Sequence, residues 1–129
     1  MNKILVEVSV GELLDKISIL EIKQEKIKDP EKLKFINDEH SILKDQLNSN
    51  VKSDEKLNTL FQSLKDINTK LWVIEDDKRL CEKNSDFTEN FIKLSRDVHF
   101  LNDGRAKIKL EINTHTGSKI KEIKEYTTY

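Results

Sequence analysis

Apolar residues recur every three or four positions along nearly the whole chain, and this spacing is the feature that most limits its fold. Four segments show it, at about 10–27, 30–47, 54–84 and 86–113. Such spacing keeps one stripe of a helix facing a neighbour. Only three Gly and one Pro interrupt the 129 residues, which suits helices better than a sheet protein rich in turns. The sequence therefore predicts an all-α fold.

The boundaries between these segments carry residues that begin helices. Ser9 with Glu12 three residues later predicts a capping box, and Asp86 with Glu89 predicts another before the fourth segment. Pro30 suits the first turn of the second helix, where its missing N–H costs nothing. We expect an antiparallel helical bundle of two hairpins, one made of two shorter helices and one of two longer helices.

The two ends of the chain are less regular than its middle. The run "ILVEV" at 4–8 is typical of a short N-terminal strand that needs a partner. In the tail, Ile120, Ile123 and Tyr126 are three residues apart, which suggests a helical turn. The length of 129 residues fits one helical domain spanning 1–129, with one modest core.

The predicted helices differ in length, and the difference bears on assembly. At 1.5 Å per residue the longer pair extends about 40 to 47 Å and the shorter pair about 27 to 29 Å, so the shorter pair cannot cover the longer. The fourth helix also carries a second apolar face with Ile92, Phe100 and Leu110. We expect a homodimer through the long hairpins, with an unidentified protein partner as the alternative.

Composition argues against several classes of partner. The chain has 23 Lys and Arg against 24 Asp and Glu, and no basic run, which disfavours nucleic-acid binding. No apolar run approaches membrane-spanning length, and the first residues are too short and too acidic for a signal peptide. Cys81 is the only cysteine and fits a reducing compartment. We expect a cytoplasmic protein that binds neither membrane nor nucleic acid.

Familiar catalytic and cofactor motifs are absent from the sequence. There is no Gly-rich phosphate loop, no CxxC and no HExxH. No histidine has a second His or Cys at metal-ligand spacing, and the acids Glu75, Asp76 and Asp77 point to different faces of a helix. We therefore expect no metal and no cofactor, and we favour an interaction or assembly module over an enzyme.

Arg105 is the most informative cation because it lies inside the apolar seam of the fourth predicted helix. Asn102, Lys109 and Asn113 share one arc of about 80° with it. A buried guanidinium without a partner costs several kcal/mol, and no acid on the seam of the third helix lies level with it. Glu21 of the first helix is the predicted ion-pair partner. An acid of a second subunit or an anionic ligand are the alternatives.

The third helix carries a parallel polar strip with Trp72, Glu75 and Arg79 beside its apolar stripe. Trp72 could floor a pocket, although a lone aromatic at helical spacing more often packs in a core or an interface. The alternative function is a small all-α enzyme or binding protein for a phosphate- or carboxylate-bearing anion, with Glu75 or Glu21 as general base or Mg²⁺ ligand. Its candidate ligand-binding residues are Trp72, Glu75, Arg79, Asn102, Arg105, Lys109 and Asn113.

Three motifs give the chain a family resemblance. They are "VSVGELLDKISILEIK", "LWVIEDDKR" and "LNDGRAKIKLEIN", followed by "GS" and a Lys- and Glu-rich tail. In this order they resemble a family of small bacterial and phage proteins of unknown function. The resemblance spans nearly the whole chain, and it implies no activity, cofactor or substrate.

Overall fold

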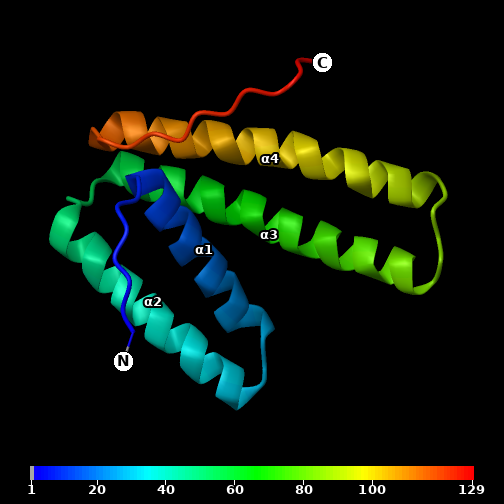
Figure 1. Cartoon of the computed structure of the whole chain (residues 1–129), viewed down its shortest axis with the longest axis horizontal. Coiled ribbons are helices and arrows are strands. Elements are labelled where there is room, and N and C mark those ends of the chain that lie inside the picture. The colour runs from blue at the N-terminus through cyan, green and yellow to red at the C-terminus, as the bar shows by residue number, and fades with distance from the viewer. Residues whose placement is uncertain (1) are drawn as a thin grey trace.

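The structure, a computed structural model, describes residues 2–129 and contains four helices. They are α1 (Val10–Lys26), α2 (Pro30–Asn50), α3 (Glu55–Lys83) and α4 (Glu89–Thr116). Helices α1 and α2 form a shorter hairpin, and α3 and α4 form a longer one (Figure 1). The predicted all-α bundle of two hairpins is confirmed. No helix among residues 2–129 is both long enough and apolar enough to cross a membrane.

The first three helices begin with a side-chain oxygen that accepts a hydrogen bond from a free backbone N–H. Ser9 caps α1, Asp29 caps α2 and Asp54 caps α3. Such caps stabilise helix starts by about 1 kcal/mol each. Only half of the predicted Ser9 capping box forms, because the carboxylate of Glu12 pairs with Lys109 at 2.8 Å. The starts predicted at Ser9 for α1 and at Pro30 for α2 are therefore confirmed.

The start of α4 differs from the prediction. Its N-cap is Thr88, which makes no side-chain capping bond. Asp86 accepts hydrogen bonds from the backbone N–H and the hydroxyl of Thr88, so it organises the turn before the helix. The predicted capping box of Asp86 and Glu89 is therefore wrong.

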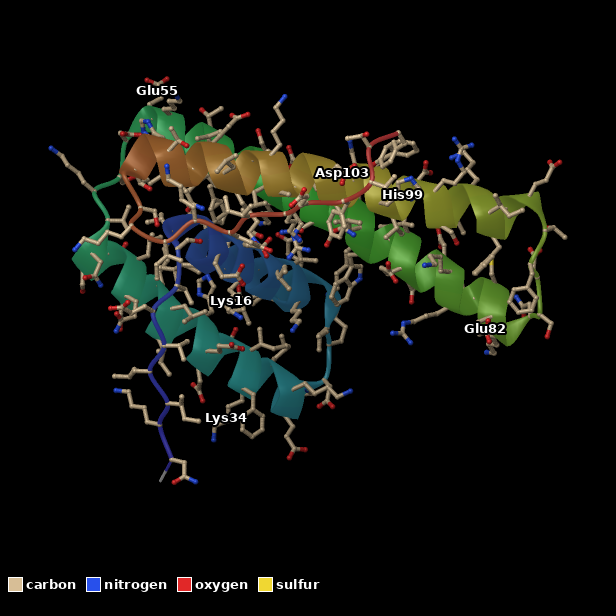
Figure 2. The ribbon with its side chains drawn as sticks, turned by 45° about the horizontal axis from the view of Figure 1, so that its top comes forward. Lys16, Lys34, Glu55, Glu82, His99 and Asp103 are labelled. Carbon is tan, nitrogen blue, oxygen red and sulfur yellow. The ribbon has the colours of Figure 1, made fainter. Side chains whose placement is uncertain are left out.

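Neither terminal segment forms regular structure. Residues 2–9 contain no strand, so the predicted N-terminal strand is wrong, and the tail after Gly117 contains no helical turn. A strand needs a neighbouring strand to pair its backbone groups, and the described residues offer none. Gly117 adopts a left-handed conformation (φ 67°), which ends α4 and turns the tail back along it. Figures 1 and 2 show the tail running beside α4, with its end near Asp103 and His99.

Helix α1 occupies the centre of the bundle. It packs against each of the other three helices, whereas α2 packs against α1 (Figure 1). Several of its apolar side chains are accordingly almost fully buried. Those with 3% exposure or less are Leu14, Ile17, Leu20 and Ile22.

The hydrophobic core lies at one end of the long hairpin, where α1 begins and α4 ends. Leu14, Leu57, Leu64 and Ile112 form it, and Leu47 of α2 packs against it. The hairpin continues past the end of α1 toward the turn between α3 and α4 (Figure 1), and we call its residues 72–100 the distal half. The remainder of α3 and α4 is the proximal half. Within the distal half, only Cys81 is buried.

Candidate functional site

A buried carboxylate lies between the two hairpins. Asp15 of α1 is 2% exposed and accepts hydrogen bonds from Nε and Nη2 of Arg105 on α4, the former at 2.9 Å. The pair is therefore bidentate, the geometry in which a planar guanidinium holds a carboxylate most firmly. A third bond comes from Asn68 of α3, whose Nδ2 lies 2.9 Å from Asp15 Oδ1. Asp15 thus joins three helices.

Ser18 completes the polar contacts around Asn68. The amide Nδ2 of Asn68 donates to Ser18 Oγ at 2.7 Å, and Ser18 donates to the backbone carbonyl of Asp15 at 2.8 Å. Every buried side-chain nitrogen and oxygen among residues 2–129 has a hydrogen-bond partner. A fully satisfied polar network of this kind orients helices, since any other packing would leave buried groups unpaired.

The surroundings of Asp15 keep it ionised. Burial by itself would raise the pKa of this carboxyl, but the hydrogen bonds from Arg105 and Asn68 and the nearby charge of Lys109 hold the pKa below its ordinary value of 3.8. The ion pair is therefore intact at neutral pH.

Lys109 forms a second charge cluster next to the first. Its Nζ donates to Glu12 at 2.8 Å and to Glu122 of the tail at 3.0 Å, and lies 3.8 Å from Asp15. Burial opposes its charge, but these carboxylates outweigh burial and raise the pKa of Lys109 above 10.5. Lys109 thus ties α1, α4 and the tail together with fixed charges.

The start of α1 touches the backbone of α4. The N–H of Gly11 donates to Asn113 Oδ1 at 2.7 Å, and a Cβ at Gly11 would lie only 2.6 Å from the carbonyl oxygen of Lys109. Glycine is required here because a larger residue would push the helices apart. Val10 N–H donates to Ser118 Oγ at 3.2 Å, which fixes the turn after α4.

The predicted partner of Arg105 was wrong. Glu21 instead lies 3.1 Å from His40 Nε2 and 3.4 Å from Lys65 Nζ, in contacts with α2 and α3. Asp15 and Glu21 are six residues apart, which places them about 120° apart around α1. Asp15 therefore faces α4 and Glu21 does not.

An open cleft lies beside the Asp15 pair, where α1 ends and α3 continues. Its volume is about 320 Å³, and it brings together several predicted ligand-binding residues: Trp72, Glu75, Arg79 and Arg105. Asn102 lies next to it, with Oδ1 3.5 Å from Arg105 Nη1. We call this space the Trp72 cleft. Among residues 2–129, no three His, Cys, Asp or Glu side chains are grouped to hold a metal ion.

Two other predicted ligand-binding residues lie elsewhere. Lys109 and Asn113 contact the start of α1 and the tail, and neither lines the Trp72 cleft. The strip of donors predicted along the fourth helix is therefore split. Arg105 lines the Trp72 cleft and also pairs with Asp15 of α1. Lys109 and Asn113 only join α4 to its neighbours.

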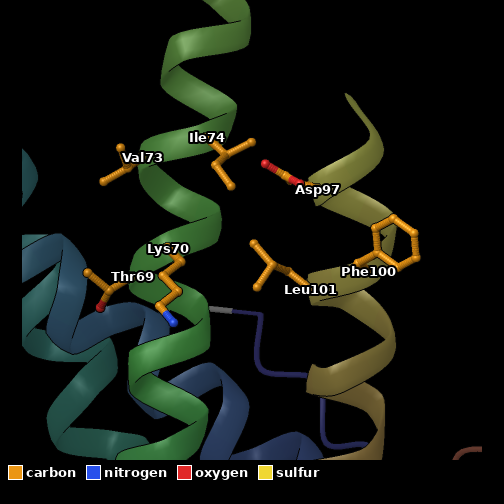
Figure 3. Close-up of a pocket in the computed structure, with 7 residues that line it drawn as sticks. All are labelled: Thr69, Lys70, Val73, Ile74, Asp97, Phe100 and Leu101. Carbon is orange, nitrogen blue, oxygen red and sulfur yellow. The ribbon is translucent and has the colours of Figure 1, made fainter. Parts of the chain in front are cut away.

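A second cavity of about 500 Å³ lies between α3 and α4. Figure 3 shows Ile74 and Leu101 on the facing sides of the two helices, with Val73 and Phe100 on their outer sides. We call it the hairpin groove, and its lining residues are Thr69, Lys70, Val73, Ile74, Asp97, Phe100 and Leu101. It begins at the border of the distal half and differs from the Trp72 cleft in every lining residue.

Comparison with known proteins gives one family. The model of a family of unknown function, DUF6165, matches residues 4–129. The chain belongs to this family. Neither the curated proteins nor the solved structures gave a match. The family agrees with the resemblance drawn from the three sequence motifs and assigns no activity.

Sequence reasoning missed Asp15, Ser18 and Glu122. A signal for the first two exists in α1, where the small residues Gly11 and Ser18 are seven residues apart and therefore share one side of the helix. Small residues in such a line indicate close approach to a neighbouring helix, and Asp15 lies beside that line. Glu122 had no comparable signal, because its role depends on the path of an irregular tail.

Proposed function

We propose that this protein is an interaction module that forms a homodimer through the hairpin groove and the distal half. The observation that carries the proposal is an apolar groove on a hairpin that no other helix covers. Val73 and Phe100 on its sides are 45% and 46% exposed, respectively. Large apolar side chains in one contiguous place are typical of an interaction surface rather than of scattered surface residues.

Further apolar side chains extend this surface toward the tip of the hairpin. Leu80, Phe87 and Ile92 are each at least 50% exposed. Two copies of a long hairpin packed together make a four-helix bundle, in which such residues become a core. Dimerisation would thus give the distal half the core that it lacks within one chain.

The charges at the groove favour a second copy of this chain as the occupant. Lys70 lies on α3 and Asp97 on α4, at the same groove. In a two-fold dimer every contact occurs twice, so that Lys70 of each copy can meet Asp97 of the other. The net charge of -1 produces little repulsion between copies.

Light scattering coupled to size-exclusion chromatography tests the proposal. We expect a mass of twice the 15.1 kDa of one chain for the wild type and the monomer mass for Phe100→Asp. Phe35→Asp is the matched control, because Phe35 is 71% exposed on α2, away from the groove, and its substitution should leave the dimer intact. A wild-type protein that is monomeric at all concentrations would contradict the proposal, as would an unchanged Phe100→Asp dimer.

A charge exchange tests the two-fold arrangement itself. Lys70→Asp and Asp97→Lys should each weaken the dimer, since like charges would then meet across the axis. An equimolar mixture of the two variants should dimerise again, because each contact joins an Asp to a Lys. If the mixture stays as weak as the single variants, Lys70 and Asp97 do not face each other across the interface.

A further inference from the structure

We infer that the Trp72 cleft binds a phosphate monoester of a sugar or nucleoside. The cleft is open at the surface and about 320 Å³ in volume, near the lower end of the range for small-molecule sites. It lies where α1 diverges from α3 (Figure 1), so its walls come from three helices that the Asp15 pair holds in place. A preorganised site of this kind costs little to order when a ligand binds.

The cleft offers a flat apolar surface. Trp72 is half-buried on α3, and Ile22 and Ile19 of α1 form the opposite wall. A sugar ring or a nucleobase can lie against an indole face, and stacking on tryptophan contributes to the binding of both flat and amphipathic ligands. A tryptophan that served only to pack against Ile22 would not need to border an open cleft.

Two guanidinium groups line the same cleft. Arg79 forms no salt bridge with any residue in 2–129. Arg105 is fixed by Asp15 through Nε and Nη2, while its Nη1 makes only a long contact of 3.5 Å with Asn102. One arginine is thus unpaired and the other is held rigidly with a donor to spare. Arginine is well suited to phosphate because its planar fork can donate two hydrogen bonds.

The acids of the cleft select among anions. Glu75 and Asp76 also line it and form no salt bridge with residues 2–129. They would repel a polyphosphate, whereas they can accept hydrogen bonds from hydroxyl or amino groups. A monophosphate carried on a ring with several such donors matches all three features of the cleft. This site shares no lining residue with the hairpin groove.

The single tryptophan of the chain makes binding directly measurable. Trp72 fluorescence, excited at wavelengths that nucleobases do not absorb, should change saturably on titration with AMP or with glucose 6-phosphate. Calorimetry provides a second readout. The esters are compared with adenosine, glucose and inorganic phosphate, each of which we expect to bind at least about tenfold more weakly than the matching ester. Preference for AMP or for glucose 6-phosphate would tell whether the ring is a nucleoside or a sugar.

Arg79→Gln tests the anion contact without disturbing the fold, since Arg79 is exposed and unpaired. We expect it to weaken binding by about tenfold or more, the loss usual for a charge-assisted hydrogen bond. Arg96→Gln is the matched control. Arg96 is also an exposed arginine but lies outside the cleft, and its loss should change affinity by less than about twofold.

Three results would overturn the inference. In the first, neither ester changes Trp72 fluorescence or releases heat at millimolar concentration. In the second, Arg79→Gln and Arg96→Gln weaken binding equally, which would show attraction to overall charge. In the third, adenosine, glucose or inorganic phosphate binds as tightly as its ester, which would show that the cleft does not recognise the two parts together.

Discussion

The proximal and distal halves of the long hairpin share the same two helices but are stabilised differently. In the proximal half, α1 lies against both helices and buries Leu14, Leu64 and Ile112 to 1% exposure or less. In the distal half, α1 reaches only the border at the Trp72 cleft and the tail touches only His99 and Phe100, and residues such as Leu80 and Ile92 remain half-exposed. A helical pair buries one side of each helix, so a third element decides whether the outer side becomes core or interface.

Charged groups around α1 also differ from those at the two cavities. Around α1 they are buried and paired, as Asp15 is with Arg105. At the Trp72 cleft and the hairpin groove, Arg79 and Lys70 line open space and make no salt bridge with residues 2–129. Paired charges fix helices relative to one another, whereas unpaired charges at a cavity are available to a ligand or to a second chain. Paired charges therefore hold the proximal half together, and the proposed binding surfaces lie in the distal half and at its border.

Removing the charge of Asp15 should destabilise the proximal half strongly. Asp15→Asn leaves Arg105 without its counter-charge and should lower the free energy of unfolding by about 3 kcal/mol, as measured by urea denaturation. Asp77→Asn, a matched change at an exposed and unpaired carboxylate of the distal half, should alter it by less than about 0.5 kcal/mol. A loss below about 1 kcal/mol for Asp15→Asn would show that the ion pair does not stabilise the proximal half.

Substitutions of two leucines test whether apolar burial stabilises the proximal half more than the distal half. Leu14→Ala opens a cavity in the core and should cost roughly 2 to 5 kcal/mol of unfolding free energy. Leu80→Ala, at a side chain 50% exposed, should cost less than about 1 kcal/mol when measured at a dilution that favours the monomer. Equal losses at the two positions would mean that the distal half has a core of its own.

Two glycines should respond with opposite sign. Gly11→Ala places a methyl group 2.6 Å from a backbone oxygen of α4, and the forced separation should cost roughly 1 to 3 kcal/mol. At Gly104 the added methyl meets only the end of the Ile67 side chain at 3.3 Å. Gly104→Ala should therefore be neutral or stabilise by up to about 1 kcal/mol through helix propensity. Thermal melts of both variants measure this, and a neutral Gly11→Ala would refute the close contact of α1 with α4.

Acid should weaken the proximal half through Asp15. Its pKa is lower in the folded than in the unfolded state, so the unfolded chain binds the proton more readily. The stabilisation is therefore complete above pH 3.8 and is lost as pH falls from there through the lower folded pKa. The difference in unfolding free energy between wild type and Asp15→Asn should be constant near neutral pH and shrink below about pH 4. A difference independent of pH would exclude an ionised Asp15.

Much of the architecture was predictable from sequence because it depends on local signals. The spacing of apolar residues gave the four helices, and Ser9 and Pro30 marked the starts of the first two. By residue number alone, an antiparallel pairing of α3 and α4 places Arg105 level with Ile67 and Asn68. The contact of Ile67 with the position of Gly104 agrees with that alignment.

The partners of Arg105 and the terminal segments could not be predicted in the same way. Which side of α1 faces α4 depends on how the two hairpins pack, and periodicity does not specify that packing. The spacing of apolar residues does not show whether Glu21 or the overlooked Asp15 faces α4, and the close contact at Gly11 shows which side of α1 does. The apolar run 4–8 had the composition of a strand, but strand formation depends on a partner that only the fold could supply.

Hydrogen exchange across a dilution series tests whether the proximal half is stable within one chain while the distal half is completed by a second copy. We expect amides of α1 and of the proximal parts of α3 and α4 to be protected equally at every protein concentration. Amides of the distal half should exchange more slowly as concentration rises and the dimer forms. Exchange in the distal half that is slow and independent of concentration, in a protein that remains monomeric, would contradict a division between a self-sufficient half and one completed by a second copy.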